Sequence, residues 1–411
     1  MTEFYDELET RDPAQRQEAL IKAVAKQVAH AKANAPAYSK ILAKVEPADL
    51  TSAEAIARLP VTRKSELIEL QKSSHPFGGF AALTGHDLAY IFASPGPIYE
   101  PGTKRGDYWR FARTLFAAGF RPGELIHNSF SYHLTPAGSM LDTGAHALGC
   151  AVIPAGVGQT ELQVQTIADL QPNGYVGTPS FLKIILEKAD EMGVDISSIN
   201  KGLVSGEALP QPLRDNFDQR GIAISQCYAT ADLGVIAYES SAREGMIVDE
   251  EIYLEVVRPG TGDPLPAGEV GELVITTLNP DYPLIRFATG DLSVVMETAS
   301  PCGRTNQRIK GWMGRADQTA KVRGMFIHPE QIDHVIKRHP EIAKARLVID
   351  WVDQADRMIL QCEMETPTDT LTEAISASIR DICKLRGEVA TVAPGALPND
   401  GKVIDDIRNY D

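Results

Sequence analysis

The first regular pattern of hydrophobic positions lies near the N-terminus, over residues 12–32. Asp12 can cap a helix there, Pro13 suits its first turn, and apolar residues recur along one face. The residues of this apolar stripe are Leu20, Val24, Val28 and Ala31. The pattern therefore predicts a helix over 12–32.

From about residue 85, the hydrophobic positions form short continuous runs that alternate with longer amphipathic stretches. The runs predict buried strands at 88–93, 150–155, 173–178 and 201–206. The longer stretches predict helices, as at 108–120 and 160–170. This alternation is typical of α/β layers around largely buried strands.

Two further patterns complete the chain. Residues 246–296 combine β-rich runs with Pro-Gly turns, which predicts antiparallel sheet. The compact tail predicts helices at 328–339 and 371–385 and strands at 345–350, 357–365 and 388–392. We therefore expect an α/β protein, with a large N-terminal domain (1–316) of layered sheets plus a β-rich subdomain and a small α+β C-terminal domain (317–411).

Composition and charge narrow the range of partners. The chain has 411 residues, of which 43% are hydrophobic, as is ordinary for a packed soluble protein. Forty basic residues against 55 acidic ones give a formal charge of -15. This balance argues against a general binder of nucleic acid or of anionic membranes. Any anionic ligand must therefore meet a local positive site.

The cysteines and the apolar runs favour a cytoplasmic protein. An odd number of cysteines without CxxC spacing cannot form a complete disulfide framework, so a reducing compartment fits best. They are Cys150, Cys227, Cys302, Cys362 and Cys383. The polar, acidic N-terminus is unlike a signal peptide, and no 18-residue apolar stretch predicts a membrane span.

Several long stretches resemble phenylacetate-CoA ligases, of the adenylate-forming superfamily of acyl-CoA synthetases. The resemblance is carried by 116–138 and 148–182, and it extends to 59–67, 282–293 and 311–332. In that family a carboxylate attacks the α-phosphate of ATP, giving an acyl adenylate and pyrophosphate. The small C-terminal domain then rotates, and the thiol of CoA displaces AMP. The resemblance thus implies ATP or AMP, Mg²⁺ and CoA as cofactors and a small-molecule acid as substrate, and relatives of this size are often homodimers.

Two charged residues resemble family positions that meet the ribose or a phosphate. Asp291 resembles the carboxylate that accepts hydrogen bonds from both ribose hydroxyls, and the alternative is a turn aspartate after Gly290. Arg308 would by the same resemblance lie near the ribose or a phosphate. The alternative for Arg308 is a solvated surface arginine.

The resemblance also implies an adenine site and an acyl pocket. Gly206 and Glu207 resemble the loop that lines the adenine, and Tyr228 resembles the aromatic residue on which the purine stacks. A core tyrosine is the alternative for Tyr228. Tyr132 and His133 fall where the family lines its acyl pocket, and a buried, hydrogen-bonded histidine is the alternative for His133.

Three residues near the C-terminus resemble parts of the mobile domain. Lys402 resembles the lysine that reaches the reacting carboxylate and the α-phosphate, where a cation stabilises developing negative charge. The alternative is a solvated lysine in a terminal loop. Asp317 resembles the hinge, and Gly324 resembles the loop that swings towards the CoA tunnel.

The sequence departs from the family at the phosphate-binding loop, which usually runs through Ser, Thr and Gly to Gly-Lys-Pro. From Ser94 this chain reads Ser-Pro-Gly-Pro-Ile-Tyr-Glu-Pro. Ser94 and Gly96 remain, but three prolines remove N–H donors, and Glu100 takes the approximate place of the lysine. A carboxylate beside a triphosphate is repulsive unless a metal or a base, such as Lys104 or Arg105, intervenes. We therefore expect a degenerate phosphate loop.

A second departure follows Tyr228, where the family has Thr or Ser before a glutamate. Ala231 lacks the hydroxyl that would face the α-phosphate, and Asp232 is one methylene shorter than the glutamate that holds magnesium. Asp232 can still bind Mg²⁺. Thr230 could replace the missing hydroxyl, although on a regular strand it would face the opposite side.

A third departure concerns the zinc site that some relatives carry. Cys302 is the single cysteine of the matching segment, and one thiolate cannot hold structural zinc without three further ligands. We expect no zinc site.

Three functions are compatible with the sequence. The first is ATP-dependent ligation of an aromatic or related acid to CoA through an acyl adenylate. The second is hydrolysis or transfer of an acyl-CoA without ATP, which the proline-rich loop and Glu100 suggest. The third is non-catalytic binding of a nucleotide or acyl-CoA, against which the retained Lys402 counts.

Overall fold

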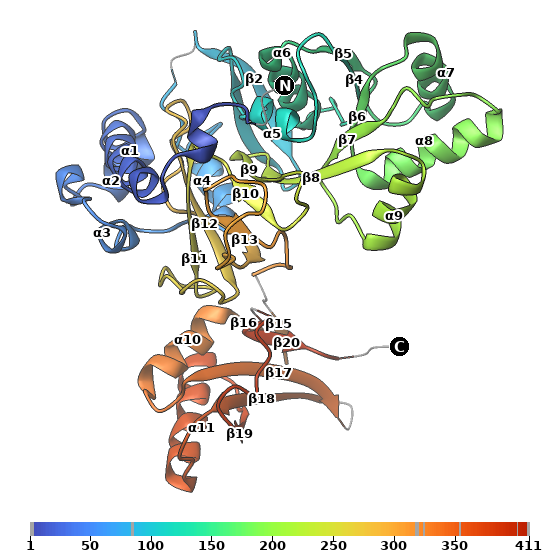
Figure 1. The fold of residues 1–411 in the computed structure, drawn as a ribbon. Coiled ribbons are helices and arrows are strands. Elements are labelled where there is room, and N and C mark those ends of the chain that lie inside the picture. The colour runs from blue at the N-terminus through green and yellow to red at the C-terminus, as the bar shows by residue number, and fades with distance from the viewer. Residues whose placement is uncertain are drawn as a thin grey trace. The chain divides into compact units, whose positions relative to one another are not determined.

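The computed structural model describes residues 4–83, 86–316, 320–323, 325–352, 355–400 and 402–408. Its α-helices are α1 (Pro13–Asn34), α2 (Pro36–Ile41), α3 (Ala53–Ala57), α4 (Leu67–Ser73), α5 (Phe111–Ala117), α6 (Ala137–Leu148), α7 (Thr160–Leu170), α8 (Pro179–Met192), α9 (Gln211–Gln219), α10 (Pro329–Arg338) and α11 (Asp369–Cys383). Short 3-10 helices are η1 (Glu7–Thr10), η2 (Pro47–Asp49) and η3 (Lys64–Glu66). The expected α/β class is confirmed (Figure 1).

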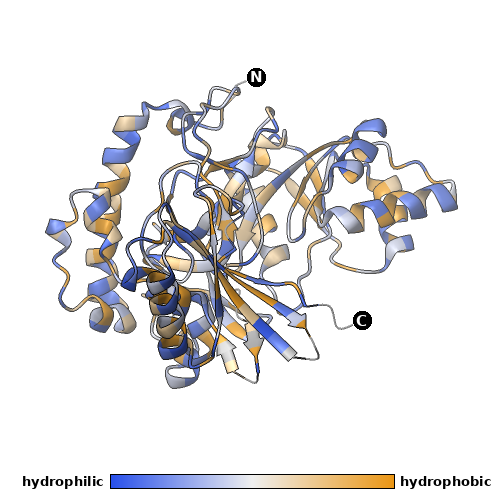
Figure 2. Ribbon diagram, turned by 90° about the horizontal axis from the view of Figure 1, so that it is seen from below, coloured by the Kyte–Doolittle hydropathy of each residue, from blue (hydrophilic) through white to orange (hydrophobic). Residues whose placement is uncertain are grey.

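Helix α1 confirms the helix predicted near the N-terminus. The carboxylate of Asp12 accepts hydrogen bonds from the N–H groups of Ala14 and Gln15 at 2.9 and 3.0 Å, and Pro13 occupies the first turn. The four residues of the apolar stripe are buried. Figure 2 shows hydrophilic and hydrophobic residues sharing the same helices, as expected where one helix face meets a core.

An eight-stranded sheet forms the centre of the first part of the chain. Its strands run in the order β14 (Arg308–Ile309), β10 (Met246–Val248), β9 (Gly234–Glu239), β8 (Ala223–Thr230), β7 (Lys201–Val204), β6 (Gly174–Gly177), β4 (Leu125–Asn128) and β5 (Ala151–Pro154). The strands from β5 to β8 are parallel, because α6, α7, α8 and α9 each return the chain to the same end of the sheet. After β8 the strands pair antiparallel.

The strand order places a switch point between β4 and β6. From β4 the chain goes to the edge strand β5, and it then crosses back to build β6, β7 and β8 on the other side. In open α/β sheets, ligands bind outside the carboxyl ends of the strands near such a point. The topology therefore indicates where to look for a site.

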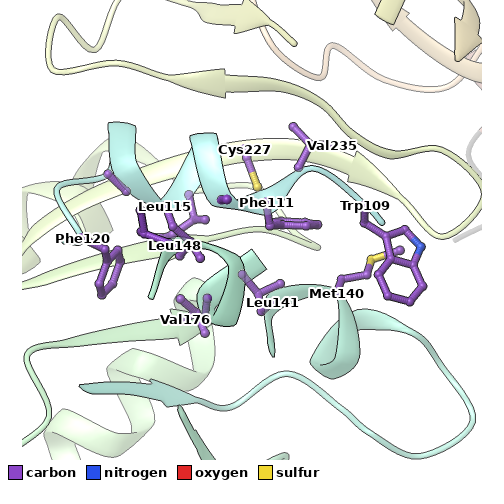
Figure 3. Packing of buried hydrophobic residues seen from close by; sticks show 14 of the residues in the cluster. Trp109, Phe111, Leu115, Phe120, Met140, Leu141, Leu148, Val176, Cys227 and Val235 are labelled. Atoms are coloured by element: carbon purple, nitrogen blue, oxygen red, sulfur yellow. The ribbon is translucent and has the colours of Figure 1, made fainter. Parts of the chain in front are cut away.

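Helices α5 and α6 pack closely in a hydrophobic core cluster beside this sheet. Phe111, Leu115, Leu141 and Leu148 meet there (Figure 3). Gly144 allows the close approach, because a Cβ atom at this position would lie 2.3 Å from the Cβ of Phe111. The helix pair thereby forms a tight wall beside the carboxyl ends of the parallel strands.

Two smaller sheets accompany the central one. A four-stranded sheet has the order β1 (Thr62–Arg63), β13 (Phe287–Ser293), β12 (Gly271–Thr277) and β11 (Ile252–Val257), and a hairpin is formed by β2 (Leu88–Ser94) and β3 (Ile98–Thr103). The strands predicted over 246–296 are therefore present. The N–H of Thr62 donates to the carbonyl of Arg286 at 3.0 Å, which holds the segment before Lys64.

The C-terminal segment folds around a second core. A sheet with the order β19 (Glu388–Val392), β18 (Ala355–Glu363), β17 (Lys344–Val352) and β20 (Ile404–Asp406) packs with α10 and α11, and β15 (Ala320–Val322) pairs with β16 (Met325–Ile327). The helices and strands predicted in the tail are thus confirmed. The side chain of Gln331 accepts the N–H of His328 at 2.9 Å and caps the start of α10.

The chain divides into two compact units. The first comprises Met1–Leu254, Ile275–Phe287 and Met296–Trp312, and the second comprises Glu255–Val274, Ala288–Val295 and Met313–Asp411. The expected hinge Asp317 and the loop residue Gly324 lie outside the described residues. The predicted domain boundary there stays a prediction. Among the helices of the described ranges, none has the length and apolar character needed to cross a bilayer.

Candidate active site

A cavity of about 120 Å³ opens in the first unit at the carboxyl ends of the parallel strands. Its apolar wall includes Phe111 from α5 and Met140 and Leu141 from α6, which Figure 3 shows side by side, together with Phe130 after β4. Its other side is formed by Ser205, Gly206, Ala229, Thr230 and Ala231. None of the described residues that line it carries a charge, so the cavity suits an uncharged, apolar group.

Gly206 is the predicted adenine-loop residue that lines this cavity. It has a φ of +85°, a conformation that favours glycine, and it lies two residues after the end of β7. The neighbouring Glu207 is exposed, and its Oε1 accepts the N–H of Ser180 at 2.7 Å. Tyr228 is buried in β8, one residue before the cavity-lining Ala229. Its stacking role stays a prediction.

Thr230 and Ala231 both line the cavity, contrary to the alternation expected of a regular strand. The pairing of β8 with β9 shifts its register between Tyr228 and Ala229, and β8 ends at Thr230. The strand geometry that would direct Thr230 to the opposite side is therefore interrupted. Its hydroxyl accepts the N–H of Leu233 at 3.2 Å.

Tyr132 and His133 are not among the described residues that line the cavity. The hydroxyl of Tyr132 donates to Asp142 Oδ1 at 2.7 Å and accepts from Asn128 Nδ2 at 2.8 Å. His133 is exposed, so the alternative of a buried histidine is wrong. The acyl-pocket role of both residues stays a prediction, while Phe111, Met140 and Leu141 are the wall residues that sequence reasoning missed.

The segment that we expected to be a degenerate phosphate loop forms the β2–β3 hairpin. Ser94 faces Ile98 across the hairpin, so Glu100, two residues further along, lies on the same face as a diagonal neighbour of Ser94. The Ser94 hydroxyl donates to Glu100 Oε1 at 2.5 Å. Glu100 is buried, with 1% of its surface exposed. The carboxylate therefore points into the protein, and Gly96 lies in the turn between the strands.

A lysine that the sequence analysis did not single out adds a positive charge near this hairpin. Lys64 Nζ donates to Asp232 Oδ2 at 2.5 Å. Burial raises the pKa of Glu100 from its ordinary value of 4.5 to about 8, and repulsion from Asp232 adds to the rise, whereas Ser94 and Lys64 oppose it. Lys64, Ser94, Glu100 and Asp232 are called the Glu100 cluster below. Lys64 lies in the stretch 59–67 that resembles the family, so that stretch is the sequence signal by which it could have been found.

Lys104 and Arg105, the two basic residues that could have offset the charge of Glu100, bind other partners. Lys104 Nζ donates to the carbonyl of His86 at 3.1 Å, and Arg105 pairs with Asp281 at 2.9 Å. Neither bends back towards Glu100 in this structure. The positive charge of the cluster comes from Lys64 instead.

Replacing Glu100 with glutamine is expected to stabilise the protein increasingly as the pH rises. With a folded pKa of about 8 against an ordinary 4.5, the wild-type carboxyl contributes its stability below pH 4.5 and loses it as the pH rises through 8. The advantage of Glu100→Gln should grow at up to about 1.4 kcal/mol per pH unit and level off above that pKa. Urea unfolding in EDTA from pH 5 to 9 measures it, and a difference that does not vary with pH contradicts it.

In the second unit, Asp291 pairs with an arginine other than the predicted one. Arg315 Nη1 lies 3.1 Å from Asp291 Oδ1, and the two residues form an isolated antiparallel bridge. Asp291 is buried on β13, with 8% of its surface exposed. A ribose-binding role for Asp291 stays a prediction, and Arg315 now stands beside it as a candidate.

Arg308 is neither solvated nor on the surface, so that alternative is wrong. It is 2% exposed on β14. Its Nη1 donates to the carbonyl of Glu244 at 2.5 Å, and its Nη2 donates to the carbonyls of Thr298 and Ala299, both at 2.9 Å. The guanidinium thus ties two loops together, which argues against a role at the nucleotide.

Lys402 lines a cavity of about 360 Å³ in the second unit, together with Arg315 and with Leu292, the neighbour of Asp291. Its Nζ lies 2.8 Å from Asp405 Oδ1, and 48% of its side chain is exposed. The lysine can therefore leave this ion pair at little cost. The cavity brings the predicted C-terminal lysine close to the strand that carries the predicted ribose carboxylate.

Cys302 has no described metal-binding neighbours. Its Sγ lies 3.0 Å from Ser300 Oγ and 3.7 Å from Arg304 Nη1. Across the described residues, no group of three or more His, Cys, Asp or Glu side chains is placed to hold a metal ion. The absence of zinc stays a prediction.

Matches to family profiles and to related proteins show to which family the chain belongs. The profile of the AMP-binding enzyme family matches residues 136–279, and that of the AMP-binding enzyme C-terminal domain matches 324–407. A phenylacetate-coenzyme A ligase of Thermus thermophilus is 32% identical over 409 residues, covering 90% of this chain and 91% of the relative. The chain belongs to the AMP-binding enzyme family. Its predicted resemblance to phenylacetate-CoA ligases is confirmed.

Further comparisons agree with this membership. A phenylacetate-coenzyme A ligase of Escherichia coli K12 is 30% identical over an alignment of 410 positions that covers 92% of this chain and 92% of the relative. A crystal structure of 2-hydroxyisobutyryl-CoA ligase in an open conformation, with its acyl adenylate and CoA, superposes with a TM-score of 0.74. It is 24% identical and covers 97% of this chain and 92% of that one, so it supports the fold. The predicted enzyme class, an AMP-forming acid–CoA ligase, is confirmed by the family.

Proposed function

We propose that this member of the family joins an aromatic or related organic acid to CoA in an ATP-dependent reaction through an acyl adenylate. The observation that carries the choice of acid is the cavity bounded by Phe111, Phe130, Met140 and Leu141. An aromatic ring buries well against such a wall. Because none of the described residues that line the cavity is charged, the carboxylate of the acid would react outside the cavity.

The proposed chemistry has two steps. A carboxylate oxygen of the acid attacks the α-phosphorus of ATP, the new C–O–P linkage forms, and pyrophosphate leaves. The sulfur of CoA then attacks the acyl carbon, the acyl–oxygen bond breaks, and AMP leaves. In the first step the ammonium of Lys402 would offset the negative charge that builds up between the two anionic reactants.

Pyrophosphate release tests the proposal. Purified protein incubated with ATP, Mg²⁺ and a panel of aromatic acids should release pyrophosphate only when an acid and ATP are both present. Adding CoA should convert the adenylate to a thioester and AMP. Binding of nucleotide without pyrophosphate release with any acid of the panel would contradict it.

The Glu100 cluster favours one alternative, an acyl-CoA hydrolase or transferase that does not use ATP. A buried carboxylate stands where the family places its phosphate-loop lysine. Release of free CoA thiol from an acyl-CoA in nucleotide-free buffer would support this alternative. A strict requirement for ATP excludes it.

Enlarging the cavity is expected to change the choice of acid. Met140→Ala shortens a buried side chain in the wall of the cavity. The variant should therefore use acids with a larger ring system, such as naphthylacetate, more efficiently relative to phenylacetate than the wild type does. We expect the ratio of their kcat/KM values to shift about tenfold or more. Leu148→Ala is the control, because Leu148 belongs to the same core and is not among the described residues lining the cavity. An equal shift in both variants would contradict the assignment.

Three further expectations belong to the same proposal. We expect the protein to act in the cytoplasm as a homodimer, with ATP or AMP, Mg²⁺ and CoA as its cofactors. Light scattering of the purified protein tests the assembly.

A further inference from the structure

One connecting segment of the first unit forms a large part of the wall of the apolar cavity. Residues 129–137, called the wall loop below, join the end of β4 to the start of α6. Four of them line the cavity: Phe130, Thr135, Pro136 and Ala137. Residues 129–136 form neither helix nor strand, so the loop depends on other contacts to keep its shape. Whatever holds this loop therefore also sets the shape of the cavity.

Asn128 joins the two ends of the wall loop. This side chain is 0% exposed and stands at the last position of β4. Its Oδ1 accepts the N–H of Phe130 at 3.0 Å, and its Nδ2 donates to the carbonyl of Gly138 at 3.0 Å. One buried amide thus binds the backbone just inside the start of the loop and just beyond its end.

Tyr132 and Asp142 extend this arrangement to the loop itself and to α6. Asn128 Nδ2 also donates to Asp142 Oδ1 at 2.9 Å and to the Tyr132 hydroxyl at 2.8 Å, and that hydroxyl donates to Asp142 Oδ1 at 2.7 Å. Burial and the neighbouring carboxylate raise the pKa of Tyr132, so the hydroxyl keeps its proton and can act as the donor. Donors from β4 and from the loop therefore meet at one carboxylate oxygen on α6.

Further contacts hold the same loop against α6 and β2. A Cβ atom at Gly138 would lie 2.7 Å from Cδ1 of Tyr132, so glycine at this position allows the ring to pack on the helix. The N–H of Gly138 donates to the carbonyl of Ser131 at 2.9 Å, and the N–H of Ala93 donates to the carbonyl of Leu134 at 2.8 Å. The loop is thus bound at both ends and in its middle.

We propose that Asn128, Tyr132 and Asp142 form a polar clamp that positions the wall loop and thereby sets which acids fit the cavity. None of the three is among the described residues that line the cavity, so they act on the substrate through the wall. They are positioning residues, and Tyr132 has its role behind the wall. The effect on acid selectivity rests on the proposed ligase function, whereas the hold on the loop in the ligand-free protein does not.

Asp142 offers a matched pair of variants for testing the clamp. Its Oδ1 accepts hydrogen bonds from both other members, so Asp142→Ala removes the shared acceptor. Asp142→Asn keeps one side-chain oxygen, which can still accept from the Tyr132 hydroxyl. The pair therefore separates loss of the acceptor from loss of the charge.

Amide hydrogen exchange of the ligand-free full chain tests the hold on the loop. Peptides that cover 129–138 should exchange roughly tenfold faster in Asp142→Ala than in wild type, because fewer contacts oppose local opening. Asp142→Asn should remain close to wild type. Thr143→Ala is the control, because the hydroxyl of this neighbouring residue donates to the carbonyl of Met140 within α6. Equal exchange in Asp142→Ala and wild type, or in the two Asp142 variants, would overturn the proposal.

Steady-state kinetics tests the effect on the acid. Asp142→Ala should raise KM for phenylacetate roughly tenfold and weaken the discrimination against naphthylacetate, while KM for ATP changes less than about twofold. A general loss of structure would instead lower kcat and affect both substrates. A rise in KM that is equal for ATP and phenylacetate, or a KM for phenylacetate that does not change, would overturn the assigned role.

A second variant keeps the test decisive if Asp142→Ala does not fold. Tyr132→Phe deletes a single oxygen of the clamp and should change amide exchange and KM for phenylacetate in the same directions. Wild-type values of both for folded Tyr132→Phe would overturn the proposal. Failure of the ligase function is distinguishable, because wild type would then release no pyrophosphate with any acid, and amide exchange would still decide whether the clamp holds the loop.

Discussion

Replacing Lys402 with alanine is expected to lower the rate of pyrophosphate release roughly 10²–10³-fold, the usual cost of removing one charge-stabilising donor from a reacting centre. Lys402 lines the same cavity as Arg315, and its ammonium is partly exposed and paired only with Asp405 among the contacts the structure records. Because such an exposed pair contributes less than about 1 kcal/mol, the fold should survive. ATP–pyrophosphate exchange measures the adenylation step.

The second half-reaction provides an internal control for Lys402→Ala. When the acyl adenylate is supplied, thioester formation should proceed at nearly the wild-type rate, since the lysine acts in adenylation. Lys337→Ala is the matched variant, because Lys337 is also exposed in the second unit and pairs with Asp333 at 2.9 Å. Equal loss of activity in both variants, or equal loss in both half-reactions, would contradict the assigned role.

Replacing Arg214 with methionine is expected to destabilise the first unit by about 3–5 kcal/mol, because it leaves a buried carboxylate without its cation. Arg214 on α9 binds both oxygens of Glu239 at 2.8 and 3.0 Å, and the two side chains are 8% and 5% exposed. Glu239 also accepts the N–H of Gln226 on β8 at 2.9 Å. Thermal unfolding should show a melting temperature lower by roughly 6 °C or more.

Two further variants test whether the loss of stability comes from the unpaired charge of Glu239 or would follow the loss of any arginine. Arg220→Met removes the exposed pair with Asp190, whose side chains are 34% and 61% exposed, and it should change stability by less than about 1 kcal/mol. Adding Glu239→Gln to Arg214→Met removes the unpaired charge and should restore part of the stability. If the double variant is no more stable than Arg214→Met, charge burial is not the cause.

The site residues show how far local sequence patterns reach. Asp291 was singled out by its motif, and the structure supplies its partner Arg315, whereas the sequence had drawn attention to Arg308 seven residues earlier. Arg315 stands in the matching stretch 311–332 and Arg308 lies just before it, so the motif alone does not decide between them. The bridge between Asp291 and Arg315 separates them, because it depends on which backbone segments lie side by side.

The sequence by itself determined the family, the alternation of strands and helices and the elements of the C-terminal segment, because these follow from contiguous motifs and from periodicity. It also predicted that the phosphate loop is altered. Only the tertiary structure decided what Glu100 meets there. Lys64 and Asp232 are 168 positions apart and meet only in the folded chain, while the register of the β2–β3 hairpin places Ser94 and Glu100 on one face. The electrostatics of the site depends on those distances, and no local pattern contains them.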